Sequence, residues 1–372
     1  MPLDPAWTGA RRLLCLRLDN LGDVLMTTPA IRALKESIPG VQLTLLTSPS
    51  GAALGPLLPD IDGLIEYEAP WVKATPPRRD SRPEFGMAAQ LQQAGFDAAV
   101  IFTVFSQNPL PAAFLTYLAG IPLRLAYCRE NPYQLLTHWA PEPDREGEIR
   151  HEVQRQLDLV GTIGARTVDD RLSLRLPAGA LRRARARLLE LGLDCERPWA
   201  LIHPGATAPS RRYPPESFAR AAACLAQEGV QLVFSGGASE RELVEAIRAA
   251  GGCPSFSLAG ALELAEFAAL VSLAPVLVAN NSGPAHIAAA VGTPVVDLYA
   301  LTNPQHTPWR VPQRVLSYDV PCKNCYRSVC PLGHHDCLRR VAPEQVAQAA
   351  LELLGEQGEA RLTLVSRGRE PA

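Results

Sequence analysis

Short apolar runs alternate with helix-length amphipathic segments along almost the whole chain, and this alternation limits the possible folds more than any other sequence feature. Residues 12–18 (RLLCLRL) predict a strand, and a turn containing Gly22 leads from it into a helix over about residues 24–37. Two further strands are expected at residues 41–47 and 97–102. Repeated strand–turn–helix units of this kind predict an α/β fold in which helices cover both faces of a parallel sheet.

The same pattern starts again after an arginine-rich helix that is expected over residues 178–191. Four more strands, separated by helices, are expected at residues 199–202, 230–234, 276–279 and 295–299. The sequence therefore predicts two α/β domains of similar size, residues 1–177 and residues 195–355. A polar tail over residues 356–372 should follow them and be frayed.

The composition excludes several classes of protein. The 372 residues include 36 Lys and Arg against 38 Asp and Glu, and the pI is about 6.4. This balance builds no field that would attract a polyanion, so we expect no nucleic-acid partner. The chain has no G-x-x-x-x-G-K-[ST] phosphate loop and no lysine or H-R-D segment placed as in protein kinases. A P-loop nucleotidase is thereby excluded, and a protein kinase is disfavoured.

The distribution of apolar residues predicts a cytoplasmic protein. The first twelve residues hold no apolar core of signal-peptide length, and the most apolar stretch, residues 262–279, contains Glu263 and Glu266. Most of the cysteines fit a reducing compartment, because they are scattered in apolar settings typical of reduced core residues. These cysteines are Cys15, Cys128, Cys195, Cys224 and Cys253.

The first candidate site is the loop after the first expected strand, residues 18–29 (LDNLGDVLMTTP). Ligands of parallel sheets bind outside the carboxyl ends of the strands, so this loop is a favoured place for a site. Asp23 lies at the start of the next helix, where it can cap the helix or act as a general base. Asp19 is a competing carboxylate. The loop lacks the G-x-G-x-x-G pattern, which argues against a dinucleotide site.

A second loop, residues 203–214 (HPGATAPSRRYP), combines several groups that suit a diphosphate. Gly205 lets a ligand approach the backbone closely, and Thr207 offers a hydroxyl group. Arg211 and Arg212 supply fixed positive charge just before a proline-initiated helix, whose N-terminus favours anions.

Two further loops carry polar groups at the carboxyl ends of expected strands. In residues 280–286 (NNSGPAH), Ser282 and the amides of Ser282 and Gly283 can face an anion. The helix dipole favours a neutral His286 there. In residues 235–240 (SGGASE), Glu240 can accept hydrogen bonds from ribose hydroxyls or serve as an acidic residue of the first helical turn.

Four cysteines crowd into residues 322–337, with the spacing Cys-x-x-Cys-x4-Cys-x6-Cys. Four thiolates within sixteen residues are typical of a closed structural zinc or iron site, and the spacing does not choose between the two metals. A redox or unliganded loop remains the alternative, and His334 and His335 are alternative ligands. The predicted metal ligands are Cys322, Cys325, Cys330 and Cys337.

Taken together, these segments resemble glycosyltransferase family 9, the ADP-heptose:lipopolysaccharide heptosyltransferase family. The opening RLDNLGDVLMTTPAIRALKESIPG is similar to the family's strand–(S)-L-G-D–helix segment. HPGATAPSRRYPPESFARAA resembles its H-P-G-x…K-x-W-P segment, and LVANNSGPAHIAAAVGTPVV its D-S-G-x-x-H-x-A-A-A-x-x-x-P run. CKNCYRSVCPLGHHDCL resembles the cysteine finger found in some members. The match covers most of residues 12–350 in the same order.

The resemblance implies a GT-B fold, in which two Rossmann-like domains face each other across a central cleft. The N-terminal domain would lie on the acceptor side, and the C-terminal domain would bind the nucleotide sugar. It implies inverting transfer of heptose from ADP-heptose to a lipopolysaccharide inner-core acceptor, without a catalytic cofactor. Asp23 matches the family's catalytic base, and Arg211 matches the residue that stabilises the departing diphosphate. The implied donor-binding residues are Thr207, Glu240, Asn281, Ser282, Gly283 and His286.

Three positions depart from the family pattern. Asn281 replaces the usual aspartate, Arg211 replaces the commoner lysine, and Asp19-Asn20 replaces a small hydroxyl pair. Arginine keeps the charge and adds bidentate geometry. The acceptor could therefore be another glycan, a protein or an antibiotic, and a nucleotide-binding module without catalysis or an NAD-dependent oxidoreductase are further alternatives. A glycolipid acceptor would imply weak peripheral contact with the inner membrane.

Overall fold

The computed structural model describes residues 1–73, 75–142 and 150–367, of which residues 358–367 are described as backbone only. The chain divides into two compact units, Met1–Arg175 and Leu176–Ala372. Each unit is built on one six-stranded sheet, and every strand pair in both sheets is parallel. No helix in the described part of the chain has the length and apolar character needed to cross a bilayer.

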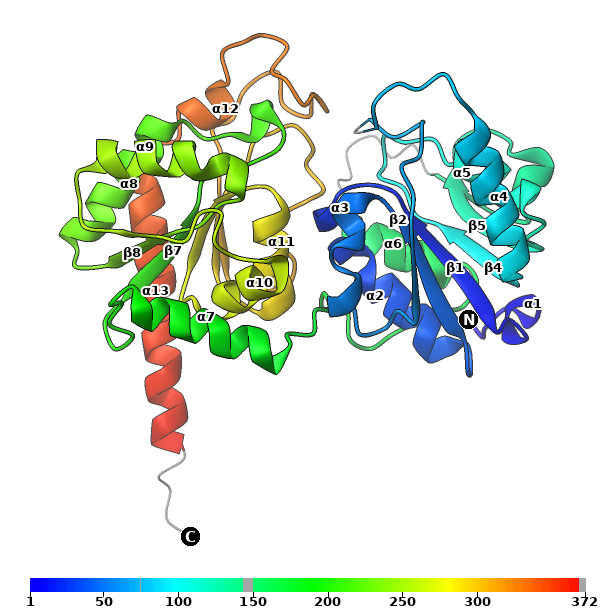
Figure 1. Ribbon diagram of the computed structural model, residues 1–372, viewed down its shortest axis with the longest axis horizontal. Coiled ribbons are helices and arrows are strands. Elements are labelled where there is room, and N and C mark those ends of the chain that lie inside the picture. Colours follow the sequence, from blue (N-terminus) through cyan, green and yellow to red (C-terminus); the bar gives the residue numbers. More distant parts are fainter. Residues whose placement is uncertain (74, 143–149, 368–372) are drawn as a thin grey trace. The chain divides into compact units, whose positions relative to one another are not determined.

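The first unit has the strand order β3-β2-β1-β4-β5-β6 (Figure 1). Its strands are β1 (Arg12–Arg17), β2 (Gln42–Thr47), β3 (Gly63–Glu66), β4 (Ala98–Ile101), β5 (Leu123–Cys128) and β6 (His138–Pro141). Its α-helices are α1 (Pro5–Thr8), α2 (Leu21–Ser37), α3 (Pro49–Ala52), α4 (Arg82–Ala94), α5 (Leu110–Leu118) and α6 (Glu152–Gly161). Two 3-10 turns, η1 (Gly55–Leu57) and η2 (Tyr133–Leu135), complete it.

Both faces of the first sheet are buried, as the continuous apolar runs predict. Leu14 and Leu16 of β1 belong to a buried cluster that includes Leu91 of α4 and Leu115 of α5. Alternate residues of a strand point to opposite faces, so the equally buried Cys15 faces the other side. On that side α2 packs against α6. Helices therefore cover the sheet on both faces, which confirms the predicted α/β class for this unit.

The second unit has the strand order β12-β11-β10-β7-β8-β9. Its strands are β7 (Trp199–His203), β8 (Gln231–Phe234), β9 (Phe256–Ser257), β10 (Leu277–Asn280), β11 (Val295–Leu298) and β12 (Gln313–Leu316). Its α-helices are α7 (Ala178–Glu190), α8 (Pro215–Gln227), α9 (Arg241–Gly251), α10 (Leu264–Leu273), α11 (Gly283–Val291), α12 (Asp336–Arg339) and α13 (Pro343–Arg367). The 3-10 turns η3 (Pro209–Arg211) and η4 (Ala238–Glu240) precede α8 and α9.

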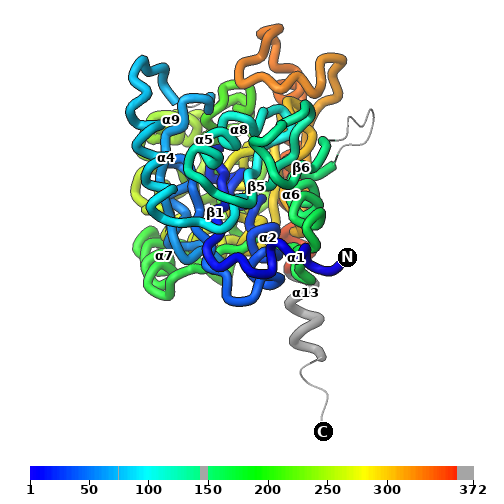
Figure 2. The backbone as a smooth tube through the Cα atoms, turned by 90° about the vertical axis from the view of Figure 1, so that its right-hand side faces the viewer, coloured from blue at the N-terminus to red at the C-terminus, as the bar shows by residue number. Residues whose placement is uncertain are grey.

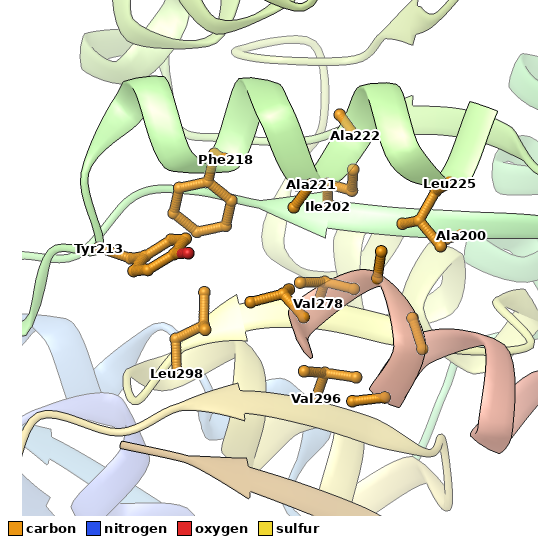
Figure 3. Close-up of a cluster of buried hydrophobic side chains, with 14 of the residues drawn as sticks. Ala200, Ile202, Tyr213, Phe218, Ala221, Ala222, Leu225, Val278, Val296 and Leu298 are labelled. Carbon is orange, nitrogen blue, oxygen red and sulfur yellow. The ribbon is translucent and has the colours of Figure 1, made fainter. Parts of the chain in front are cut away.

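The core of the second unit lies between the sheet and the helices α8, α9 and α13 (Figure 3). Ile202, Val278 and Val296 come from three adjacent strands and point into this cluster. Tyr213 packs edge-on against Phe218, with ring centroids 5.2 Å apart. The buried phenol group of Tyr213 donates a hydrogen bond of 2.8 Å to the carbonyl of Val341. This core fixes the loops that follow β7 and β10.

The boundaries of the two units differ from the expected ones at two places. The second unit begins at Leu176, because α7 packs against α10 and its Arg183 pairs with Glu266. The polar tail expected from residue 356 continues α13 as a helix to Arg367. The last five residues of the expected tail lie outside the described residues.

Candidate functional site

In the first unit, three carboxyl groups meet at the end of β1, around a guanidinium group that has no exposed surface. Arg17 Nε lies 3.1 Å from Asp19 Oδ2, and Arg17 Nη2 lies 3.4 Å from Asp23 Oδ1. Arg17 Nη1 lies 2.9 Å from Oε1 of Glu152, a residue of α6 that is also fully buried. Arg17 therefore holds three carboxylates in fixed positions and offsets their charges.

The geometry of Asp23 is compatible with either of the two roles that its position allows. Its Oδ2 accepts a hydrogen bond of 3.2 Å from the backbone amide of Asn20, so it closes the first turn of α2. Its Oδ1 faces Arg17, and the side chain keeps 14% of its surface exposed. The capping interaction is thus present, and part of the same carboxylate remains exposed, where a substrate can reach it.

Asp19 lies in a different environment, although it is only four residues away. Burial raises the pKa of Asp19, while the charge of Arg17 and a hydrogen bond donated by Gln107 lower it. A pocket of about 270 Å³ lies beside Gln107, with Leu18, Trp71 and Ala112 among its apolar walls. A ligand in this pocket would contact apolar surface on one side and amide groups on the other.

In the second unit, the loop after β7 packs against Glu240. A Cβ atom added to Gly205 would lie 1.8 Å from Glu240 Oε1, so no larger residue fits there with Glu240 in this position. Glu240 Oε2 accepts a hydrogen bond of 2.7 Å from the amide of Gly237 and lies 3.6 Å from His203 Nε2. Burial lowers the pKa of His203, and its Nδ1 lies 3.1 Å from Ser235 Oγ.

A cavity of about 760 Å³ opens at these loops. Thr207 and Glu240 both line it, together with Arg212 and the first residues of α8. His335 and Arg339, from the cysteine-rich segment, form another part of its wall. Arg211, which the resemblance marks as the diphosphate-binding arginine, does not line this cavity, whereas the neighbouring Arg212 does.

The loop after β10 is tied to the loop after β7 by Asn280. Its Nδ2 donates to the carbonyl of Pro204 at 2.7 Å, and its Oδ1 accepts from the amide of Tyr213 at 2.9 Å. Ser282 is the N-cap residue of α11, and Gly283 is the first residue of that helix. The predicted anion-binding amides therefore lie at a helix N-terminus, where they favour negative charge. His286 is buried in the same helix.

A carboxylate that the sequence analysis missed lies beside Asn281. Asn281 Nδ2 donates to Asp297 Oδ2 at 3.0 Å and to the carbonyl of His306 at 2.8 Å. Asp297 on β11 is fully buried, and its Oδ1 accepts no hydrogen bond from the residues that the structure describes. Burial raises the pKa of Asp297 to about 7, against the hydrogen bond from Asn281 and the positive charge of Arg211. Arg211 thus lies close enough to Asp297 for their charges to interact.

The four predicted metal ligands lie in one segment, and burial raises the pKa of Cys337, with a further contribution from the charges of Cys322, Cys325 and Cys330. Among the residues that the structure describes, no group of three His, Cys, Asp or Glu side chains is arranged to hold a metal ion. The Sγ of Cys322 lies 3.7 Å from His334 Nε2. Burial raises the pKa of the Cys330 thiol, but the backbone amides of residues 332–335 outweigh it and leave the pKa lowered. Such amides also stabilise metal-bound thiolates, which supports a metal site in this segment. The four-cysteine site itself stays a prediction.

Two Rossmann-like units, each with polar loops at the carboxyl ends of its strands, are the architecture of the GT-B class. Residues 85–335 match the family model described as "Glycosyltransferase family 9 (heptosyltransferase)". The chain belongs to this family. Membership confirms the predicted family and an enzyme of the glycosyltransferase class, and it removes the oxidoreductase alternative.

Relatives of known identity cover nearly the whole chain. Lipopolysaccharide heptosyltransferase 2 of Salmonella typhimurium is 26% identical over an alignment of 352 residues that covers 91% of this chain and 97% of that protein. The solved family 9 glycosyltransferase of Veillonella parvula aligns with a TM-score of 0.76 at 23% identity, covering 96% of this chain and 99% of that one. The ADP-heptose lps heptosyltransferase II of E. coli aligns with a TM-score of 0.71 at 24% identity, covering 93% and 99%. These likenesses confirm the predicted fold.

Proposed function

We propose that this glycosyltransferase moves heptose from ADP-heptose to an inner-core sugar of lipopolysaccharide, at the cytoplasmic face of the inner membrane. The observation that carries the proposal is the Asp23 carboxylate, held by buried Arg17 at the carboxyl edge of its sheet. The relatives named above, which are called lipopolysaccharide heptosyltransferases, support the choice of donor and acceptor.

In the proposed reaction, the second unit binds the donor. The diphosphate contacts Thr207 and the N-terminus of α11, where Ser282, Gly283 and His286 lie. The Glu240 carboxylate accepts hydrogen bonds from the ribose hydroxyls. Asn281 takes part through its amide, which Asp297 and the carbonyl of His306 hold in place.

The chemical step needs one base and one group that stabilises the leaving diphosphate. Asp23 accepts the proton of the acceptor hydroxyl while the oxygen of that hydroxyl forms a bond to C1 of the heptose. The bond between C1 and the diphosphate oxygen breaks, and ADP leaves with the electron pair. Attack from the face opposite the leaving group inverts C1. The guanidinium of Arg211 offsets the charge that develops on the diphosphate, and no cofactor takes part in this scheme.

The test is turnover of ADP-heptose by wild type and by Asp23→Asn, measured as release of ADP with a heptose-deficient lipopolysaccharide core as acceptor. Asn keeps the size of the side chain and removes the base, so we expect kcat to fall by at least about 100-fold. Binding of ADP, measured as a thermal shift, should be unchanged. Equal rates for the two proteins would reject Asp23 as the base.

The same experiment separates the alternatives. ADP at about 100 times its dissociation constant stabilises a protein by about 2.7 kcal/mol, so a bound nucleotide is visible as a melting shift. Stabilisation by ADP without turnover on any acceptor would indicate a nucleotide-binding module that lacks catalysis. Turnover with a different glycan, but not with the lipopolysaccharide core, would keep the transferase and change the acceptor. Stabilisation by UDP or GDP instead of ADP would discard the proposed donor.

A further inference from the structure

The outward face of α5 in the first unit is aromatic and carries no charge. None of the nine residues of this helix is charged, and Ala113 and Thr116 on its inner side are fully buried. Phe114, Tyr117 and Leu118 lie on the outer side, at the i, i+3, i+4 spacing of one helical face. Their side chains are 52%, 48% and 44% exposed. A helix at a water-facing surface normally presents polar or charged residues there.

The neighbouring elements extend this surface. Helix α4 lies beside α5 in both views of the chain (Figures 1 and 2) and contacts it. Beyond Glu84 in its first turn, α4 has no charged residue, and its Phe85 is 69% exposed. The turn η2 also contacts α5, and its Tyr133 is 80% exposed. We call Phe85, Phe114, Tyr117, Leu118 and Tyr133 the aromatic face.

Basic residues gather at the amino-terminal end of α4. Lys73 and Arg79 in the preceding loop are exposed, and so is Arg82 in the first turn. Asp80 pairs with Arg82, and Glu84 pairs with Arg78, so the two acidic residues of this segment are already matched by arginines. The uncharged face is thus bordered by positive charge, which complements anionic lipid headgroups.

The aromatic face also lies close to the pocket of about 270 Å³ that Gln107 lines. That pocket is lined by Trp71 of the loop before α4 and by Pro111 and Ala112 of the first turn of α5. Both helices start at the carboxyl edge of the sheet, the edge at which Asp23 lies. An acceptor sugar at Asp23 that is attached to a lipid could therefore reach the bilayer along the first turn of α5.

We propose that the aromatic face docks the first unit onto a bilayer that contains anionic lipid. The rings of Phe85, Phe114 and Tyr117 insert at the headgroup level, where aromatic side chains gain most from partial burial. Lys73 and Arg79 contact the phosphate groups, and their contribution weakens with salt. The role of the aromatic face in catalysis rests on the proposed function, in which the acceptor is linked to a lipid. Binding of the aromatic face to a bilayer does not depend on that proposal.

The test is co-flotation of the full chain with vesicles of phosphatidylethanolamine and phosphatidylglycerol, and with vesicles of phosphatidylcholine alone. Wild type should float with the anionic vesicles, less in 0.5 M salt, and weakly with the neutral ones. Phe85→Gln combined with Phe114→Gln should lower the partition coefficient at least about tenfold, because the variant lacks two exposed rings that leave water when wild type binds. Arg79→Gln should weaken binding only to the anionic vesicles.

The matched control is Val168→Gln combined with Leu189→Gln, which removes two exposed apolar side chains outside the aromatic face. This control should bind as wild type does, and melting curves should show all variants folded. Equal flotation of wild type and the Phe85/Phe114 variant would overturn the proposal, as would equal losses in the variant and the control. Dimers in light scattering that dissociate in the variant, without vesicle binding, would make the face a subunit interface instead.

Activity distinguishes this inference from the proposed function. On a delipidated core oligosaccharide, the Phe85/Phe114 variant should keep the wild-type rate, because neither residue lies in the site. On acceptor embedded in vesicles, its rate should fall with its binding. If wild type binds vesicles but has no transferase activity, and the Phe85/Phe114 variant does not bind vesicles, the docking surface is upheld and the proposed function is rejected.

Discussion

Arg17 makes three ion pairs inside a protein core, where removing one partner of a buried pair leaves uncompensated charge. Arg17→Met should therefore lower the free energy of unfolding by about 3–5 kcal/mol. Adding Glu152→Met should recover part of this loss, because it removes the most deeply buried of the three carboxylates. Urea denaturation of the two single variants and the double variant measures the coupling. Additive losses would show that Arg17 and Glu152 do not depend on each other.

Asp297 should make stability depend on pH. Its pKa is about 7 in the fold and about 3.9 in an unfolded chain, so the fold binds the proton more tightly. The contribution of the protonated Asp297 carboxyl to the free energy of unfolding is complete below pH 4. It is lost as the pH rises toward 7. Asp297→Asn keeps an acceptor for Asn281 and removes the titration. The difference in Tm between this variant and wild type should therefore change with pH. From pH 5 to pH 8, it should shift by at least about 3 °C in favour of the variant.

The control for this pH effect is Asp169→Asn. Hydrogen bonds from Arg171 lower the pKa of Asp169, so this carboxylate is ionised throughout pH 5–8 and its loss should shift Tm equally at both ends. A constant difference between Asp297→Asn and wild type over this range would contradict the assignment. Such a result would mean that Asp297 is ionised in the fold at pH 5.

At the scale of elements, the sequence predicts most of the central strands but misses β5, and it predicts none of the edge strands. The strands β1, β2, β7, β10 and β11 are apolar runs because both faces of the sheet are covered. The edge strand β3 alternates between half-buried and exposed residues, and β9 has only two residues, so neither forms an apolar run. The loops after central strands were predictable as sites for the same reason: their positions follow from the order of strands and helices.

The partners within the sites were not predictable, because they come from distant parts of the chain. Glu152 reaches Arg17 across 135 residues, and no local pattern marks that pairing. The available signal was a charged residue inside an apolar run, as with Arg17 in RLLCLRL and Asp297 in VVDLY. A charge in a doubly covered strand needs a buried partner, so each of these positions predicts an ion pair or hydrogen bond.

The contact between two loops gives a prediction for a single glycine. Gly205→Ala should displace Glu240, because the new Cβ would overlap its carboxylate. If Glu240 binds the ribose, KM for ADP-heptose should rise at least about tenfold, the equivalent of about one hydrogen bond to a charged group. Gly86→Ala is the control, since nothing lies within 4 Å of its added Cβ. An unchanged KM in Gly205→Ala would remove Glu240 from the donor site.

The cysteine-rich segment gives a second prediction at this scale. Protein purified without an affinity metal should contain about one zinc or iron per chain, bound by Cys322, Cys325, Cys330 and Cys337. The Cys330→Ser variant should lose most of this metal. The control Cys253→Ser changes an isolated cysteine outside the segment and should keep the metal. Since His335 and Arg339 line the cavity near Glu240, loss of the metal should also weaken ADP binding. Less than about a tenth of a metal per chain would reject the four-cysteine site.

At the scale of the whole molecule, the two units have separate cores and separate sheets, so each can respond to its own ligand. In the proposed function ADP binds only to the second unit. Saturating ADP should therefore slow hydrogen exchange most in the loops after β7, β8 and β10. The rest of that unit should gain less protection from exchange. The loop after β1, which carries Asp19 and Asp23, should exchange at the same rate with and without ADP, because Arg17 and Gln107, which hold these two carboxylates, belong to the first unit. Strong ADP protection of that loop, with none after β10, would assign the nucleotide to the first unit and reverse the proposed roles of the two sheets.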